Sequence, residues 1–214
     1  MSNICQVVLF LCASLLIEAY LISDKVFPVL DLLRIGSLND QFASSLVSQL
    51  PLFEEIVPKF LSGDNPTNQM LTLRMLNNLF GTQTVSLMAH RGAIATQVLN
   101  NLSKPKNNQI AAATLFLNYS IVVTSKDSTQ DPTWSGMENQ TEILMSAITL
   151  VDVMEDTEAV YRILVALGNL IYGNPMSIQL FKGLSGDSIA KNYQREGGLP
   201  KIQQCAAEIL ALIQ

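Results

Sequence analysis

The sequence predicts an all-α fold, an armadillo/HEAT-like helical repeat array wound into a right-handed superhelix. Hydrophobic residues make up 49% of the 214 residues and charged residues only 14%, so the chain can bury a large core. Apolar residues recur at helical spacing between turn signals, and no segment shows the convincing alternation of a half-buried strand. Similar helical cores also return at intervals of about 40 residues, the period of armadillo and HEAT repeats.

The clearest helix begins at Asp156 and ends at a Gly-Asn-Pro sequence. Asp156 is a good N-cap, and Glu158 adds a negative charge at the positive end of the helix dipole. Arg162 and Asn169 are seven residues, or two turns, apart and therefore share one face as a sparse polar stripe. This pattern predicts a helix that lines a groove. Its core face is formed by apolar residues three and four apart, namely Ile163, Leu164, Leu167, Leu170 and Ile171.

The chain starts with a nearly continuous apolar run, Ile4–Ile22, of about the length that spans a bilayer. No Lys or Arg precedes it and Glu18 lies inside it, which favours a buried or capping helix over a signal peptide or anchor. Glycosylation sequons begin at Asn101, Asn118 and Asn139, but Asn118 lies in an apolar helical pattern that has no space for a glycan. We therefore expect the protein in the cytoplasm, with the nucleus as a second compartment.

Shorter helices separated by turn residues are expected along the rest of the chain. Pro28 fits only the first turn of its helix, and Asn65 and Pro66 are suited to begin another. Ser135 and Glu138 have the spacing of a capping box for a helix that continues through Met154. A polar loop is expected over 125–137. The other expected helices are 26–35, 39–49, 52–61, 67–80, 84–100 with a break near Gly92, 108–123, 175–184, 188–193 and 201–213.

Charge and motifs exclude several classes of function. The net charge of −5 argues against nucleic acid and anionic membranes as partners, although it allows a local basic pocket. The three cysteines are scattered and suggest neither a disulfide framework nor a zinc site. His90, the only histidine, is expected to be exposed on a helix, and no catalytic set or phosphate loop can be assembled. We expect no enzyme, no catalytic residue, no metal and no cofactor.

Three leucine-rich helical cores can be aligned on Asn78, Asn118 and Asn169, which are 40 and 51 residues apart. In armadillo arrays one helix of each repeat lines a concave groove. An amide in that position can donate to and accept from the backbone of an extended peptide. The alternative is that each asparagine bonds to a neighbouring loop of the protein itself.

Two arginines lie on the same faces as these asparagines. Arg74 precedes Asn78 by four residues, and Arg162 precedes Asn169 by seven. The planar guanidinium donates two parallel hydrogen bonds to a carboxylate. We interpret the two arginines, with Asn78, Asn118 and Asn169, as a binding site for an acidic peptide. A structural salt bridge is the alternative role for each arginine.

Five blocks in the correct order resemble the PUL domain, and the resemblance runs from about Ser23 to the end. It predicts one domain over 23–214 and leaves 1–22 outside as an apolar N-terminal segment. No single block is diagnostic, but the set is specific. The blocks are Ser23–Ile35, Asn68–Gly81, Ala111–Ile121, Glu158–Tyr172 and Gln203–Ile213.

The resemblance implies an armadillo-like domain whose basic groove receives the acidic C-terminal tail of valosin-containing protein, the ubiquitin-selective AAA ATPase. It thus implies an adaptor in ubiquitin-dependent protein turnover and ubiquitin recycling. The groove arginines of the family fall on Arg74 and Arg162, with Asn118 and Asn169 beside them. Full-length members carry a β-propeller and a ubiquitin-binding module upstream, for which this chain has no room, so ubiquitin binding is not carried over.

Two alternatives remain open. One is an armadillo scaffold for another acidic or phosphorylated peptide. The other is a membrane-anchored helical protein led by Ile4–Ile22.

Overall fold

The computed structural model describes residues 26–125, 136–196 and 198–214. All regular secondary structure in these ranges is helical, which confirms the predicted all-α class. The chain divides into two compact units with the boundary between Ser103 and Lys104. No helix in the described ranges is long and apolar enough to cross a membrane, and the Ile4–Ile22 run lies outside them.

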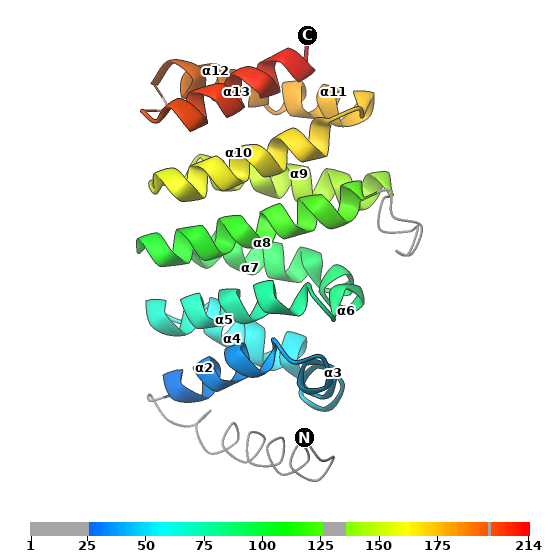
Figure 1. The fold of residues 1–214 in the computed structure, drawn as a ribbon, viewed down its shortest axis with the longest axis vertical. Coiled ribbons are helices and arrows are strands. Elements are labelled where there is room, and N and C mark those ends of the chain that lie inside the picture. Colours follow the sequence, from blue (N-terminus) through cyan, green and yellow to red (C-terminus); the bar gives the residue numbers. More distant parts are fainter. Residues whose placement is uncertain (1–25, 126–135, 197) are drawn as a thin grey trace. The chain divides into compact units, whose positions relative to one another are not determined.

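In the first unit, α5 packs against α2 and α4, and α4 also contacts α7 (Figure 1). The sequence led us to expect one helix over 52–61, but the structure begins this segment with a turn of π-helix, η1. Pro58 has no N–H to donate to the carbonyl of Glu54, so an α-helical bond is missing at this position. The elements are α2 (Phe27–Gly36), α3 (Asp40–Gln49), η1 (Leu52–Ile56), α4 (Val57–Leu61), α5 (Pro66–Leu79), α6 (Thr84–Ala89) and α7 (Arg91–Asn101).

In the second unit, α10 packs between α8 and α13, and these three helices lie side by side (Figure 1). Behind them, α9 contacts α8 and α10, and α11 contacts α9, α10 and α12. The buried face of α10 contains the five apolar residues predicted for it. The helices are α8 (Lys106–Thr124), α9 (Met137–Val151), α10 (Thr157–Ile171), α11 (Pro175–Gly183), α12 (Gly186–Glu196) and α13 (Pro200–Leu212).

Side-chain caps begin four of the helices in the described ranges, namely α3, α5, α10 and α11. The Asn65 side chain accepts from the backbone N–H groups of Thr67 and Asn68, and Asp156 caps α10 in the same way. Gly173 has a positive φ of 64°, as expected after a helix. Asn174 then caps the next helix, α11. Turn chemistry in the sequence therefore set these boundaries.

The expectations for α9 and for the exposure of His90 need correction. The N-cap of α9 is Gly136, without a side-chain cap, and the helix ends at Val151 instead of Met154; Ser135 lies outside the described residues. The break expected near Gly92 is present and falls at His90, between α6 and α7. His90 itself is half-buried, because its ring stacks on Phe53 with 4.4 Å between the centroids.

The turn between α11 and α12 depends on a glycine for space. An added Cβ on Gly186 would lie 2.4 Å from Cε2 of Phe181, whose ring is fully buried. Gly186→Ala is therefore expected to lower the free energy of unfolding by about 1–3 kcal/mol, as overpacking does. At Gly183 an added Cβ meets no atom within 4 Å, so Gly183→Ala is the matched control. Urea unfolding of both variants checks this; equal stabilities would contradict it.

Candidate functional site

Helix α5 of the first unit carries Arg74 and Asn78. Arg74 is exposed and has no hydrogen-bond or ion-pair partner among the residues that the structure describes. The half-buried Asn78 donates from Nδ2 to the backbone oxygen of Arg34 at 2.8 Å, near the end of α2. Asn78 therefore bonds a carbonyl at a helix end, the structural role that the sequence offered as the alternative, while Arg74 remains accessible to a ligand.

In the second unit, a buried glutamine fixes the start of α10. The Gln109 Oε1 atom accepts hydrogen bonds from the backbone N–H groups of Glu155 and Asp156, at 2.7 and 2.9 Å. Its Nε2 atom donates to the Lys104 carbonyl at 2.6 Å. Because Asp156 is the N-cap of α10, Gln109 positions the first turn of that helix and the residues that follow it.

A group of charged residues lies at the start of α10. Arg162 Nε donates to Glu158 Oε1 at 3.0 Å, and Lys201 Nζ, from α13, donates to Glu158 Oε2 at 2.6 Å. Arg162 also donates from Nη1 to the Thr114 hydroxyl on α8. The structural salt bridge that the sequence offered as the alternative for Arg162 is thus present, and one carboxylate bridges two cations.

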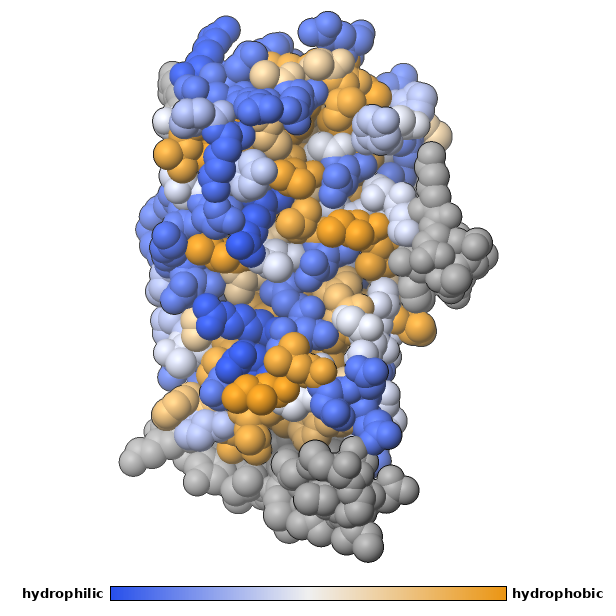
Figure 2. Space-filling model, in the orientation of Figure 1, coloured by the Kyte–Doolittle hydropathy of each residue, from blue (hydrophilic) through white to orange (hydrophobic). Residues whose placement is uncertain are grey.

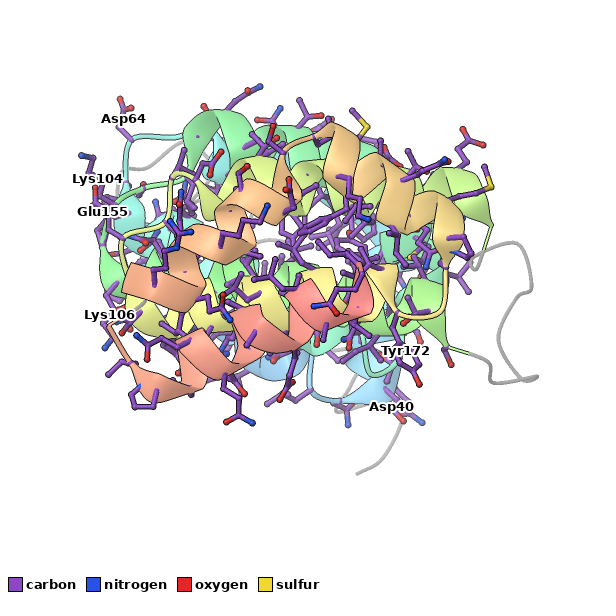
Figure 3. The ribbon with its side chains drawn as sticks, turned by 90° about the horizontal axis from the view of Figure 1, so that it is seen from above. Asp40, Asp64, Lys104, Lys106, Glu155 and Tyr172 are labelled. Carbon is purple, nitrogen blue, oxygen red and sulfur yellow. The ribbon has the colours of Figure 1, made fainter. Side chains whose placement is uncertain are left out.

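The hydrogen bonds from Lys201 and Arg162 lower the pKa of Glu158 below its ordinary value. The carboxylate is therefore ionised at neutral pH, and the three side chains together carry one net positive charge. Hydrophilic residues gather over the starts of α8, α10 and α13 (Figure 2). Lys104 pairs with Glu155 at this end of the unit, while Tyr172 lies at the opposite end (Figure 3).

The other two asparagines lie farther along the same helices of the second unit. Asn169 Nδ2 donates to the Ser120 hydroxyl at 3.2 Å, so it connects α10 to α8. Asn118 is half-buried on α8, two residues before Ser120. The structure thus places Asn118, Arg162 and Asn169 on two packed helices of one unit, while Arg74 and Asn78 belong to the other unit.

Sequence reasoning missed two residues of this site, Lys201 and Gln109. Lys201 joins the carboxylate of Glu158 from another helix, and no local pattern signals that contact. Gln109 could have been found from the repeat, because the dipeptides Asn68-Gln69 and Asn108-Gln109 are 40 residues apart, like Asn78 and Asn118. Gln69 also binds backbone where helices end: it donates to the carbonyls of Leu61 and Asn101, the last residues of α4 and α7, and accepts from Ser103 N–H.

In the described part of the chain, no group of His, Cys, Asp or Glu side chains is arranged to hold a metal ion. The arrangement instead offers cations and amides on helix surfaces. Such groups bind carboxylates and peptide backbone by charge-assisted and neutral hydrogen bonds.

Comparison with a solved structure supports the fold. An engineered protein aligns over 94% of this chain and 98% of its own, with a TM-score of 0.51 and 14% identity. A second engineered protein aligns over 94% of this chain and 96% of its own, with a TM-score of 0.49 and 15% identity. At this identity the first alignment shows only a shared fold.

Comparison with other sequences identifies the family. The chain is 31% identical over 198 residues to phospholipase A-2-activating protein of Xenopus laevis, an alignment that covers 89% of this chain. The chain spans about a quarter of that relative, since the alignment covers 24% of its length. The PUL domain profile matches residues 11–208, and its match starts upstream of Ser23. The chain therefore belongs to the PUL domain family.

Proposed function

We propose that this chain is a non-enzymatic adaptor domain that binds the acidic C-terminal tail of valosin-containing protein, the ubiquitin-selective AAA ATPase. In this role it connects the ATPase to ubiquitin-dependent protein turnover and ubiquitin recycling. Membership of the PUL family is the observation that carries the proposal, because tail binding is what that family implies. The coverage of about a quarter of the Xenopus laevis relative limits the proposal to this domain.

The proposed contacts are those of Arg74, Asn78, Asn118, Arg162 and Asn169. Arg74 supports the proposal because it is exposed and unpaired among the described residues, and an incoming carboxylate replaces only water around it. Arg162 is about one third exposed, so a carboxylate can also approach its guanidinium. Asn78 and Asn169 each use Nδ2 inside the protein, which leaves their side-chain oxygens as acceptors for peptide N–H groups.

The test is a calorimetric titration of the full chain with a synthetic peptide of the ATPase tail, at low and at moderate salt. We expect a dissociation constant on the order of micromolar that increases with salt, because exposed charge contacts are screened. A peptide with its acidic residues replaced by the matching amides is the control and should not bind.

The outcomes separate two functions. Equal binding of unrelated acidic or phosphorylated peptides would support the more general scaffold. The absence of tail binding by a folded chain would refute the proposed function and leave the fold unaffected.

A further inference from the structure

The contact among Glu158, Arg162 and Lys201 has the geometry of an occupied carboxylate site. Each oxygen of Glu158 accepts from one cation, at 3.0 Å from Arg162 and 2.6 Å from Lys201. These are the distances expected when a carboxylate is bound by charge-assisted hydrogen bonds. The bound carboxylate in this structure belongs to the protein itself.

The two cations are held in place by other contacts as well. Arg162 donates to the Thr114 hydroxyl, which in turn donates to the Ile110 carbonyl on the same helix. The Lys201 ammonium lies 4.5 Å from the centre of the Tyr161 ring, within the range of a cation–π contact. Arg162 and Lys201 would therefore keep their positions if the Glu158 side chain turned away. Binding of a ligand would then not cost the free energy of ordering these two side chains.

The site is accessible from solvent. The side chains of Arg162, Lys201 and Glu158 are 32%, 44% and 33% exposed. An exposed ion pair contributes little stability, so an external carboxylate can exchange with the Glu158 carboxylate at low cost. Because Glu158 is tethered beside the cations, its effective concentration is high, and a ligand with a single carboxylate competes poorly.

We infer that Arg162 and Lys201 form a carboxylate-binding site that Glu158 occupies in the free protein, and that Glu158 selects for peptides with several acidic residues. This inference rests on the proposed function, since it concerns Arg162 of the same surface. Lys201 becomes a second contact for the peptide, and Glu158 becomes the competitor that the peptide displaces. A segment with adjacent carboxylates overcomes the competition because its other charges reach further cations, such as Lys106 on α8, which is exposed and lies 3.6 Å from Asp156 Oδ2.

The test compares Glu158→Gln with the unmodified full chain. The amide keeps the size of the side chain but removes the charge that neutralises one cation and repels an acidic ligand. We expect the variant to bind the ATPase-tail peptide about five-fold more tightly, with a steeper dependence on salt. Glu158→Ala should also bind the tail peptide more tightly than the unmodified chain. Adding Lys201→Met to Glu158→Gln should abolish the gain.

Glu208→Gln is the matched control, because it removes one negative charge from an exposed residue of α13 that contacts Gln204 and not these cations. If Glu208→Gln bound the tail peptide as much more tightly as Glu158→Gln does, the change in net charge alone would explain the gain in affinity. That result would overturn the inference. A synthetic hexaglutamate peptide is titrated in parallel. If the unmodified chain binds the tail and Glu158→Gln binds it no more tightly, the inference fails while the proposed function stands.

The remaining outcomes are also decisive. A failure of both proteins to bind either peptide would overturn both proposals. Tighter binding of hexaglutamate by Glu158→Gln, without tail binding by either protein, would support the carboxylate site and refute the proposed function.

Discussion

Replacing both Arg74 and Arg162 by alanine is expected to weaken binding of the ATPase tail about 100-fold. Each arginine would lose a charge-assisted hydrogen bond to a ligand carboxylate, and two such losses together correspond to about 2.7 kcal/mol. Removal of Arg162 also leaves Glu158 with Lys201 as its only cationic partner among the described residues, so the charge of this group falls from positive to neutral. Titration calorimetry with the tail peptide measures the effect.

The control for this variant removes two positive charges elsewhere. Lys182→Ala combined with Arg195→Ala changes exposed residues of α11 and α12 and should leave tail binding nearly unchanged. Arg162→Lys should retain part of the affinity, because an ammonium keeps the charge but cannot make the two parallel bonds of a guanidinium. Equal affinity of the double arginine variant and the unmodified chain would remove both arginines from the proposed site.

Replacing Gln109 by methionine is expected to lower the free energy of unfolding by about 3 kcal/mol. Methionine has nearly the same volume, so packing is preserved, but three backbone groups lose their partners. These are the N–H groups of Glu155 and Asp156 and the carbonyl of Lys104. Urea unfolding gives the stability, and hydrogen exchange at the two amides gives the local effect.

This variant also connects stability to the proposed function. Gln109 positions the N-cap of α10, so its loss should loosen the Glu158–Arg162 pair one turn later and weaken tail binding several-fold. Gln204→Met is the control, because Gln204 is exposed on α13 and bonds only to Glu208 among the described residues. Unchanged exchange at Glu155 and Asp156 in Gln109→Met would show that the glutamine does not hold this turn.

Much of the local structure could be predicted because it depends on contacts between near neighbours. Asn65 and Asp156 cap their helices as expected, since a cap bonds backbone only two or three residues away. The apolar spacing in α10 predicted its buried face for the same reason. The expectation failed at Ser135, where Gly136 takes the N-cap position, because spacing alone does not decide which residue begins a helix.

The partners of the candidate site residues could not be predicted. The periodicity placed Arg162 and Asn169 on one face of a helix, and both do bond to α8. It could not show that Asn78 would bond to the Arg34 carbonyl, 44 residues away, or that Lys201 would reach Glu158 across 43 residues. The sequence also did not decide whether Arg74 and Arg162 form salt bridges within the protein or are accessible to a ligand.

The sequence by itself determined the all-α class, the repeat spacing and most helix ends, because apolar period and capping chemistry act over a few residues. The tertiary structure alone decided that Arg74 is accessible, that Arg162 shares a carboxylate with Lys201, and that Gln109 fixes the start of α10. These contacts join residues far apart in the chain. They form only once packing has set the distance between helices, and a one-dimensional pattern does not contain that distance.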